Sequence, residues 1–257
     1  MKMFGVALLY WMACDAAQAQ APKPEDYDRF FPDQACDHRA YDLAIRGYGI
    51  LRDEDVLAER RYLTIIDFTK RSNVPRLFVL DVKKKSLVLQ SIVSHGLGSD
   101  PDSTTIPYRF SNRDGSHATS VGFYLTGRTY YNYRPADSLG LCLFGLDSGY
   151  NDAAAAREIV VHYGATERRG NVYVTDTGAG RSYGCPALPL STNTRFIRTV
   201  EGGSVVFVYS DKVADYEASS SVLRRRMKWP LRQRGPAPNF CACEIQPGRW
   251  RYDATRR

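Results

Sequence analysis

The chain has 257 residues, of which 44% are hydrophobic and 12% aromatic, and its formal net charge is +7 at pH 7. That length suits one sizeable domain with appendages, and the aromatic content excludes a chain that is disordered throughout. Ten Lys and Arg residues, against two Asp and Glu, lie between residues 222 and 257, so the basicity belongs to the C-terminal tail.

The N-terminus has the features of a secretory signal peptide. A basic start precedes an apolar run that is too short for a comfortable membrane span, and a small-x-small cleavage site ends at Ala19. Residues 1–19 are therefore predicted to be a signal peptide, which places the protein in the periplasm or otherwise outside the cytoplasm. Two alternatives stay open: a retained apolar N-terminus, and a lipid anchor on Cys14, although Trp11 stands where such sites usually carry a small aliphatic residue.

Residues 20–61 are predicted to form a linker and a helical preface. Residues 20–35 are polar and contain proline, which is typical of a linker. Between residues 37 and 55, apolar residues recur at helical spacing and indicate one amphipathic helix, which the glycines of the "RGYG" segment can break. The apolar positions are Tyr41, Ala44, Tyr48 and Leu51.

Short β-branched segments, each bounded by polar turns, predict a series of strands along the next part of the chain. They cover residues 62–68, 76–82, 86–93, 120–127, 141–146, 158–163, 171–176 and 204–210. The pattern predicts a mainly β (α+β) domain over residues 62–211, followed by a basic extension over residues 212–257.

Two helices are expected among these strands. They cover residues 151–158 and residues 191–202, and Gly202 stops the second. The candidate N-caps are Asn151 or Asp152 for the first and Ser191 or Thr192 for the second.

The cysteines point to one odd thiol. Export leaves five of them in an oxidising compartment, where an even set tends to pair. Parity therefore leaves Cys185 unpaired, in the segment "RSYGCPAL", and predicts two disulfides among the other four. These four are Cys36, Cys142, Cys241 and Cys243. The last two are too close in sequence to pair with each other without strain, so each is expected to reach back to one of the first two.

A cysteine that can be reached becomes a nucleophile when a histidine accepts its proton. His162 ends the apolar strand "IVVHY", which can hold an imidazole firmly at a cleft. Around Cys185 a tight turn at Gly184 can aim backbone N–H groups at an oxyanion, while Ser182 can hydrogen-bond within the turn and Tyr183 can wall the cleft.

The residues alone leave other interpretations open. The cysteine can fill a core pocket or form a disulfide, and the histidine can bond to backbone carbonyls. A zinc site of His95, His162 and Cys185 is a third interpretation, but it lacks the close-spaced ligand pairs of zinc sites. We expect no metal and no cofactor.

Several segments in order resemble the murein L,D-transpeptidase catalytic domain family, from about residue 63 to residue 209. They are "VSHGLGS", "SVGFYLTG", "LCLFGLD", "IVVHYGA", "GRSYGCPAL" and "GSVVFVY". In that family a histidine lies upstream of a cysteine that Ser-x-Gly precedes. The resemblance implies a β-sandwich or barrel, with Cys185 as nucleophile, His162 as base and the backbone N–H groups of Tyr183, Gly184 and Cys185 around the oxyanion.

Two positions depart from the broad family. Tyr183 replaces the second histidine of its Ser-His-Gly-Cys motif, and Ala187 stands where Arg or Asn often follows the cysteine. The form Arg-Ser-x-Gly-Cys-Pro-Ala is the one expected in this branch. Substrate contacts of the broad family are therefore not carried over.

The resemblance implies an exported cysteine acyltransferase that acts on peptidoglycan stem peptides. Its thioester would pass to an amine of a neighbouring stem, giving a 3→3 cross-link, to water, as in an L,D-carboxypeptidase, or to a protein lysine. The expected substrate contacts are Ser94, His95, Gly96 and the loop of residues 99–119.

Two other functions stay open: a wall-binding module without catalysis, and a thiol–disulfide protein that uses Cys241 and Cys243. The basic tail is either a solvated end or an attachment to an anionic wall or membrane surface. Nucleic acid is not an expected partner of an exported chain, and the sequence assigns no oligomeric state.

Overall fold

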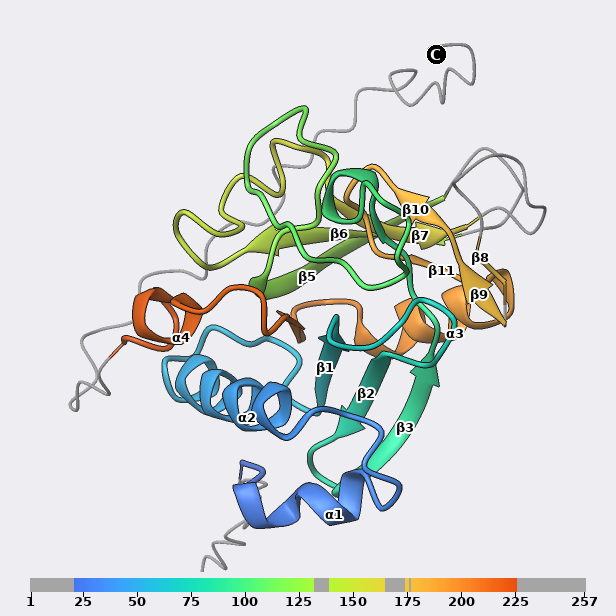
Figure 1. Ribbon diagram of the computed structural model, residues 1–257. Helices are drawn as coiled ribbons and strands as arrows, with labels where there is room; N and C mark the ends of the chain where they lie inside the picture. The colour runs from blue at the N-terminus through green and yellow to red at the C-terminus, as the bar shows by residue number, and fades with distance from the viewer. Residues whose placement is uncertain (1–20, 132–138, 165–173, 176, 226–257) are drawn as a thin grey trace, which may run out of the picture.

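The computed structural model describes residues 21–131, 139–164, 174–175 and 177–225. Most of its regular structure is β, in one curved eight-stranded sheet of order β11-β7-β6-β5-β12-β1-β2-β3 (Figure 1), so the predicted fold class is confirmed. Its strands are β1 (Tyr62–Asp67), β2 (Leu77–Asp81), β3 (Ser86–Ser91), β5 (Gly122–Tyr131), β6 (Leu139–Gly145), β7 (Val160–Tyr163), β11 (Ala187–Leu188) and β12 (Val205–Tyr209).

Four two-residue strands form two further pairs. β4 (His95–Gly96) pairs in parallel with β10 (Arg181–Ser182), and β8 (Val174–Thr175) pairs antiparallel with β9 (Gly178–Ala179). The helical elements are η1 (Pro24–Asp26), α1 (Tyr27–Phe30), α2 (His38–Asp53), η2 (Leu97–Ser99), α3 (Leu190–Val200) and α4 (Tyr216–Ser219).

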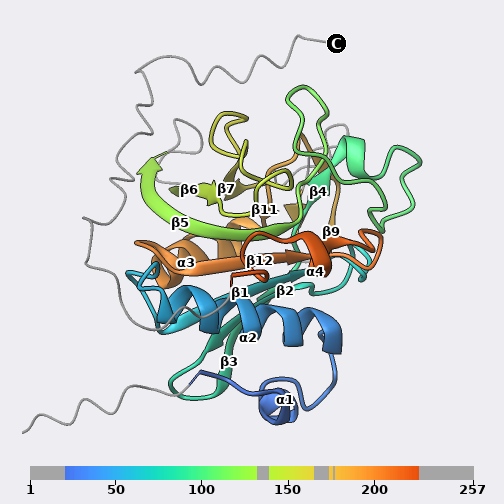
Figure 2. The same ribbon diagram turned by 90° about the vertical axis from the view of Figure 1, so that its left-hand side faces the viewer.

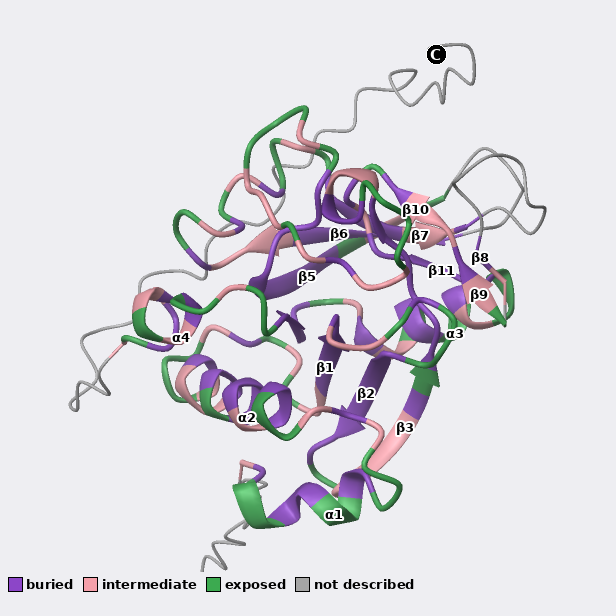
Figure 3. Ribbon diagram, in the orientation of Figure 1, coloured by how far each residue is buried: buried purple, intermediate pink, exposed green. Residues whose placement is uncertain are grey.

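The sheet has a core on each face, because both faces are covered by helices. On β12, Val205 and Phe207 belong to the core that contains α2, whereas Val206 and Val208 belong to the core that contains α3. Figures 1 and 2 show α2 and α3 on different sides of this part of the sheet. A strand covered on both faces is apolar throughout rather than alternating, as "VVFVY" is. Figure 3 shows β1 and β2 buried over nearly their whole length, and all five residues of β12 are buried as well.

Helix α2 runs without a break through the "RGYG" segment, so the break that its glycines allow is absent. Gly47 lies against the ring of Phe123, and a Cβ atom there would collide with it. This glycine therefore allows close packing of the helix on the sheet. At the helix start, the Asp37 side chain accepts hydrogen bonds from the N–H groups of Arg39 and Ala40, at 2.8 and 3.1 Å.

The N-terminal segment is packed rather than a linker. Tyr27, Phe30 and Phe31 are buried in the core with α2. Asp26 accepts hydrogen bonds from the Lys85 ammonium at 2.8 and 2.9 Å, which ties this segment to the turn between β2 and β3. The polar composition of residues 20–35 outweighed these aromatic residues in the sequence pattern, and so the segment was predicted to be a linker.

The predicted helix over residues 151–158 is wrong, because the segment forms successive turns. Asn151 does not cap a helix; its side chain accepts from the Asp147 N–H at 2.8 Å and donates to the Phe123 carbonyl at 2.9 Å. Glu158 has a left-handed backbone with φ of 57°, which stops any helix there. The helix predicted over 191–202 is present as α3, and Gly202 follows it with φ of 85°.

Cys36 is a free, buried thiol, so the predicted disulfide at this residue is absent. It lies among aromatic side chains of the N-terminal core, where a thiol packs as a small apolar group. Cys142 is buried on β6, and no disulfide joins the cysteines of the described ranges. Cys241 and Cys243 lie outside those ranges, as do residues 1–19 and most of the basic tail. None of the helices the structure describes is long and apolar enough to cross a membrane.

The chain continues to pack beyond β12, through a buried carboxylate. Asp147 is fully buried and accepts hydrogen bonds from the Phe123 N–H (2.8 Å), the Tyr216 hydroxyl (2.6 Å), the Ser220 hydroxyl (2.5 Å) and the Val222 N–H (3.1 Å). One side chain thus fastens α4 and the segment after it to β5.

We expect Asp147→Ala to lower the free energy of unfolding by about 3–4 kcal/mol, because it leaves several buried donors without an acceptor. Urea unfolding followed by circular dichroism measures it. Asp211→Ala is the matched control: this exposed carboxylate pairs with the neighbouring Lys212, and its loss should change stability by less than about 0.5 kcal/mol. Equal stability of the two variants would contradict the anchoring role.

Candidate active site

The two edges of the sheet meet beside Cys185. The Ser94 N–H, shortly after edge strand β3, donates to the Ala187 carbonyl of edge strand β11 at 2.9 Å, and the Ala187 N–H donates to Ser94 Oγ at 3.0 Å. Ser94 Oγ also lies 3.3 Å from the Cys185 carbonyl. We call this junction of Ser94 and Ala187 the seam. The seam fixes the chain directly after Cys185.

His162 is held on the neighbouring strand. In the parallel pair of β7 and β11, His162 is opposite Ala187, and its N–H lies 3.4 Å from the Pro186 carbonyl. Its Nδ1 is 2.6 Å from the Tyr163 carbonyl. Because a carbonyl only accepts, Nδ1 carries the proton and Nε2 is left as the basic atom. Burial lowers the pKa of His162, with the Tyr163 hydrogen bond opposing it, so the imidazole is neutral near pH 7.

Cys185 is a protonated thiol at rest. Burial raises its pKa to about 11, although the Val160 N–H and the positive charge of Arg157 lower it in part. Its Sγ lies 3.7 Å from the Glu158 carbonyl. The thiol and the imidazole are therefore both neutral at rest, and the pairing of β7 with β11 places the segments that carry them side by side.

A local hydrogen-bond network shapes the loop around the thiol. Ser182 Oγ donates to the Cys185 carbonyl at 2.6 Å and accepts from the Gly184 N–H at 3.1 Å. Gly184 has φ of 117°, and a Cβ atom on it would lie 2.9 Å from the Ala118 carbonyl oxygen, so both its backbone and its surroundings favour glycine. The oxyanion role of the loop N–H groups stays a prediction.

Tyr183 is 49% exposed and contacts a second histidine. Its ring centroid lies 4.7 Å from that of His117, which is also exposed. The loop of residues 99–119 thus contacts the segment of residues 182–188 that carries Cys185, which we call the nucleophile loop, while its contact with substrate stays a prediction. The sequence pattern did not single out His117 for this place.

The predicted substrate contacts Ser94, His95 and Gly96 are all buried. His95 Nδ1 accepts from the Arg76 guanidinium at 2.8 Å, and its Nε2 lies 3.4 Å from the Asp100 carboxylate. Burial and the charge of Arg76 lower the pKa of His95 to about 3, so it is neutral. In the structure these three residues make contacts within the fold; their contact with substrate stays a prediction.

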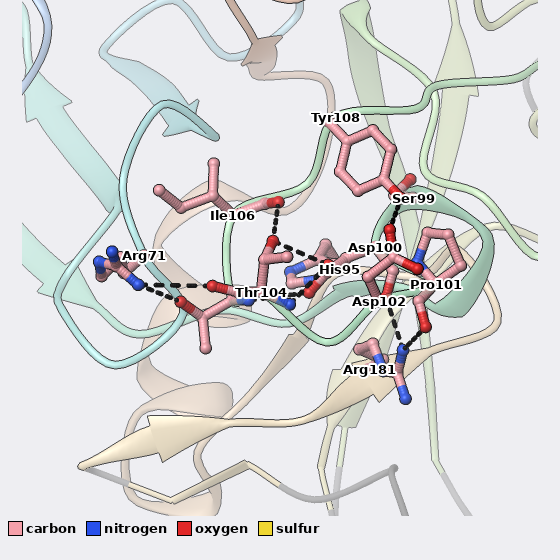
Figure 4. Close-up of polar contacts among 12 residues, drawn as sticks. Arg71, His95, Ser99, Asp100, Pro101, Asp102, Thr104, Ile106, Tyr108 and Arg181 are labelled. Carbon is pink, nitrogen blue, oxygen red and sulfur yellow. Dashed lines mark hydrogen bonds and ion pairs between the residues drawn. The ribbon is translucent and has the colours of Figure 1, made fainter.

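Figure 4 shows how the loop behind His95 is fixed. The Asp100 carboxylate accepts from the N–H and hydroxyl of Thr104 at 2.8 and 2.9 Å, and from the Thr105 N–H at 2.9 Å. Arg181, directly before Ser182, donates to the Asp100 carbonyl at 2.5 Å (Figure 4). The loop that contains Asp100 is therefore joined to strand β10 by a hydrogen bond from the Arg181 side chain to a main-chain oxygen atom.

Sequence reasoning missed Arg157 and Glu158, which precede β7 and contact the nucleophile loop. Both lay inside a segment whose alanines predict a helix, and no motif singled them out. The available signal was the presence of two charged residues, Arg157 and Glu158, directly before the strand that carries His162. Among the described residues, no three His, Cys, Asp or Glu side chains converge on a position where they could hold a metal ion.

A thiol and an imidazole placed in this way can carry out nucleophilic acyl transfer. A family model described as the L,D-transpeptidase catalytic domain matches residues 32–209, which is more than half of the chain. The chain belongs to the L,D-transpeptidase catalytic domain family, and the family expected from the sequence is confirmed.

Solved structures similar to this chain include an L,D-transpeptidase from Mycobacterium smegmatis, at 12% identity and a TM-score of 0.35, covering 58% of this chain and 59% of that one. Another is the helical cell shape determining protein Pgp2 from Campylobacter jejuni, at 15% identity and a TM-score of 0.37, with coverages of 64% and 53%. The chain thus spans less than two thirds of the length of these structures. A search of curated proteins found no match.

Proposed function

We propose that this protein is a cysteine-dependent L,D-transpeptidase that acts on peptidoglycan stem peptides. The observation that carries the proposal is the register of β7 with β11, which holds His162 beside the loop of Cys185 in a chain of this family. The neutral state of both groups and the Nδ1–H tautomer of the imidazole support a general-base mechanism.

In the first half-reaction, Cys185 Sγ attacks the carbonyl of the L-centred diaminoacyl residue, and its proton passes to His162 Nε2. A C–S bond forms and the C–N bond to the terminal D-amino acid breaks. His162 then gives the proton to the leaving amine. The products are a thioester on Cys185 and a free D-amino acid.

In the second half-reaction, an amine of a neighbouring stem attacks the thioester. The C–S bond breaks, a new amide bond forms, and the amine proton returns to the sulfur through His162. The product is a 3→3 cross-link. Water at the same step gives an L,D-carboxypeptidase, and a protein lysine anchors a protein to the wall.

Export belongs to this proposal, because the substrate lies outside the cytoplasm. The signal-peptide features of residues 1–19 support it. The basic tail supports attachment to an anionic wall or membrane surface.

Intact-mass analysis after incubation with a disaccharide tetrapeptide tests the proposal. We expect a covalent adduct equal to the stem minus its terminal D-amino acid, and its conversion to a dimer when acceptor stems are added. An adduct that only water removes would indicate the carboxypeptidase. Binding to the wall without any adduct would refute acyl transfer and favour a binding module.

A further inference from the structure

A single stretch of six residues surrounds Cys185. The stretch is residues 157–162. The Arg157 side chain lies near Gly184, the Glu158 carbonyl lies 3.7 Å from Cys185 Sγ, and His162, the proposed base, ends the stretch. Between Ser182 and Leu188 the nucleophile loop itself contains no basic residue. Any positive charge near the sulfur therefore comes from outside these seven residues.

The Arg157 guanidinium clamps the segment of residues 111–120. One Nη atom donates to the Ser111 carbonyl at 2.8 Å and to Ser120 Oγ at 2.6 Å, and the other donates to the Ala118 carbonyl at 2.7 Å. A further contact, with Ser116 Oγ, measures 3.3 Å. These partners are all neutral oxygen atoms, so the hydrogen bonds position the guanidinium without neutralising it.

The segment that Arg157 holds lies against Gly184, the residue before Cys185. The Ala118 carbonyl oxygen and Arg157 Nη2 would lie 2.9 and 3.4 Å from a Cβ atom on Gly184. The guanidinium thus lies directly behind the backbone that carries Cys185. A cation near a thiol favours the thiolate, and the charge of Arg157 acts in this direction on the pKa of Cys185.

The other charged and titratable groups around the thiol do not replace this cation. Glu158 is exposed and carries the opposite charge, which disfavours a thiolate, and His162 is neutral at rest. Arg157 is the cation whose charge favours the ionised form of Cys185.

We propose that Arg157 is a positioning residue for Cys185: its guanidinium holds the 111–120 segment against Gly184, and its positive charge stabilises the negative sulfur that forms during attack. The inference rests on the proposed function for the purpose it serves, but ionisation of the thiol can be measured without any substrate.

The test is the pH dependence of Cys185 alkylation by iodoacetamide, resolved from other thiols by peptide mapping. In Arg157→Gln we expect alkylation at pH 7 to slow by roughly three- to tenfold and the profile to move to higher pH, because the charge is lost. Arg157→Lys should retain most of the wild-type rate but melt at a lower temperature, because one ammonium cannot bridge the same oxygen atoms.

Arg195→Gln is the matched control, since Arg195 is exposed and donates to the Val88 carbonyl on β3. It should leave the alkylation profile unchanged. A wild-type profile in folded Arg157→Gln would overturn the proposal and leave Arg157 a purely structural clamp. If the Gln variant does not fold, the Lys variant decides: a tenfold loss of rate in it would overturn the charge effect. Failure of wild-type protein to form a stem adduct would instead refute the proposed function.

Discussion

Cys185→Ala is expected to abolish the covalent adduct with stem peptides while the protein stays folded. In the proposed mechanism the sulfur is the attacking atom, and no other side chain can replace it in the thioester. The side chain is small and only partly buried, so its truncation should leave the strand content intact. Intact mass measures the adduct, and far-ultraviolet circular dichroism measures the fold.

Cys36→Ala is the matched control for this prediction. Cys36 is a buried thiol in the N-terminal core, remote in sequence from the nucleophile loop. In the Cys36→Ala variant the covalent adduct should form as in the wild type, and the small cavity should lower the stability of the protein. An adduct of wild-type yield in Cys185→Ala would rule out the mechanism.

His162→Ala is expected to lower the acylation rate by roughly 10²- to 10⁴-fold, the usual contribution of a positioned acid–base group. Because burial lowers the pKa of His162, the wild-type rate should stay high near pH 7 and fall only as the pH drops below the ordinary histidine value of about 6.5. Protonation removes the base, so this acidic limb should vanish in the variant. Single-turnover acylation across pH measures both effects.

His95→Gln separates the two buried histidines. His95 lies between Arg76 and Asp100 and is neutral, so its loss should affect stability while the acidic limb remains. A larger loss of acylation in His95→Gln than in His162→Ala would mean that His95, and not His162, is the base.

The long strands could be predicted because their residues are apolar on both faces or bounded by clear turns. β1, β2 and β12 follow this rule, and their two-sided burial gives a signal that does not depend on distant partners. The two-residue strands β4, β10 and β11 are too short for any such signal, and only their pairing defines them.

Part of the site could also be predicted. The order of motifs singled out Cys185 and His162, and the pairing of β7 with β11 places their segments side by side, while their catalytic roles stay predictions. The place of Arg157 depends on long-range contacts to the Ser111 and Ala118 carbonyls, which leave no periodic pattern. The same holds for the turns of residues 151–158, where alanine favours a helix but the inward contacts of Asn151 decide the outcome.

The seam has a consequence for the order in which the protein acquires its reactive centre. Ser94 and Ala187 are 93 residues apart along the chain, and bringing them together carries a loop-closure cost that local elements do not. The pairing of β7 with β11 places His162 beside the Cys185 loop, whereas the seam fixes the chain directly after Cys185, so a chain without the seam has only one of these two supports. We therefore expect the seam to form late in folding, and the loop of Cys185 to take its final shape only when the two edges of the sheet have joined.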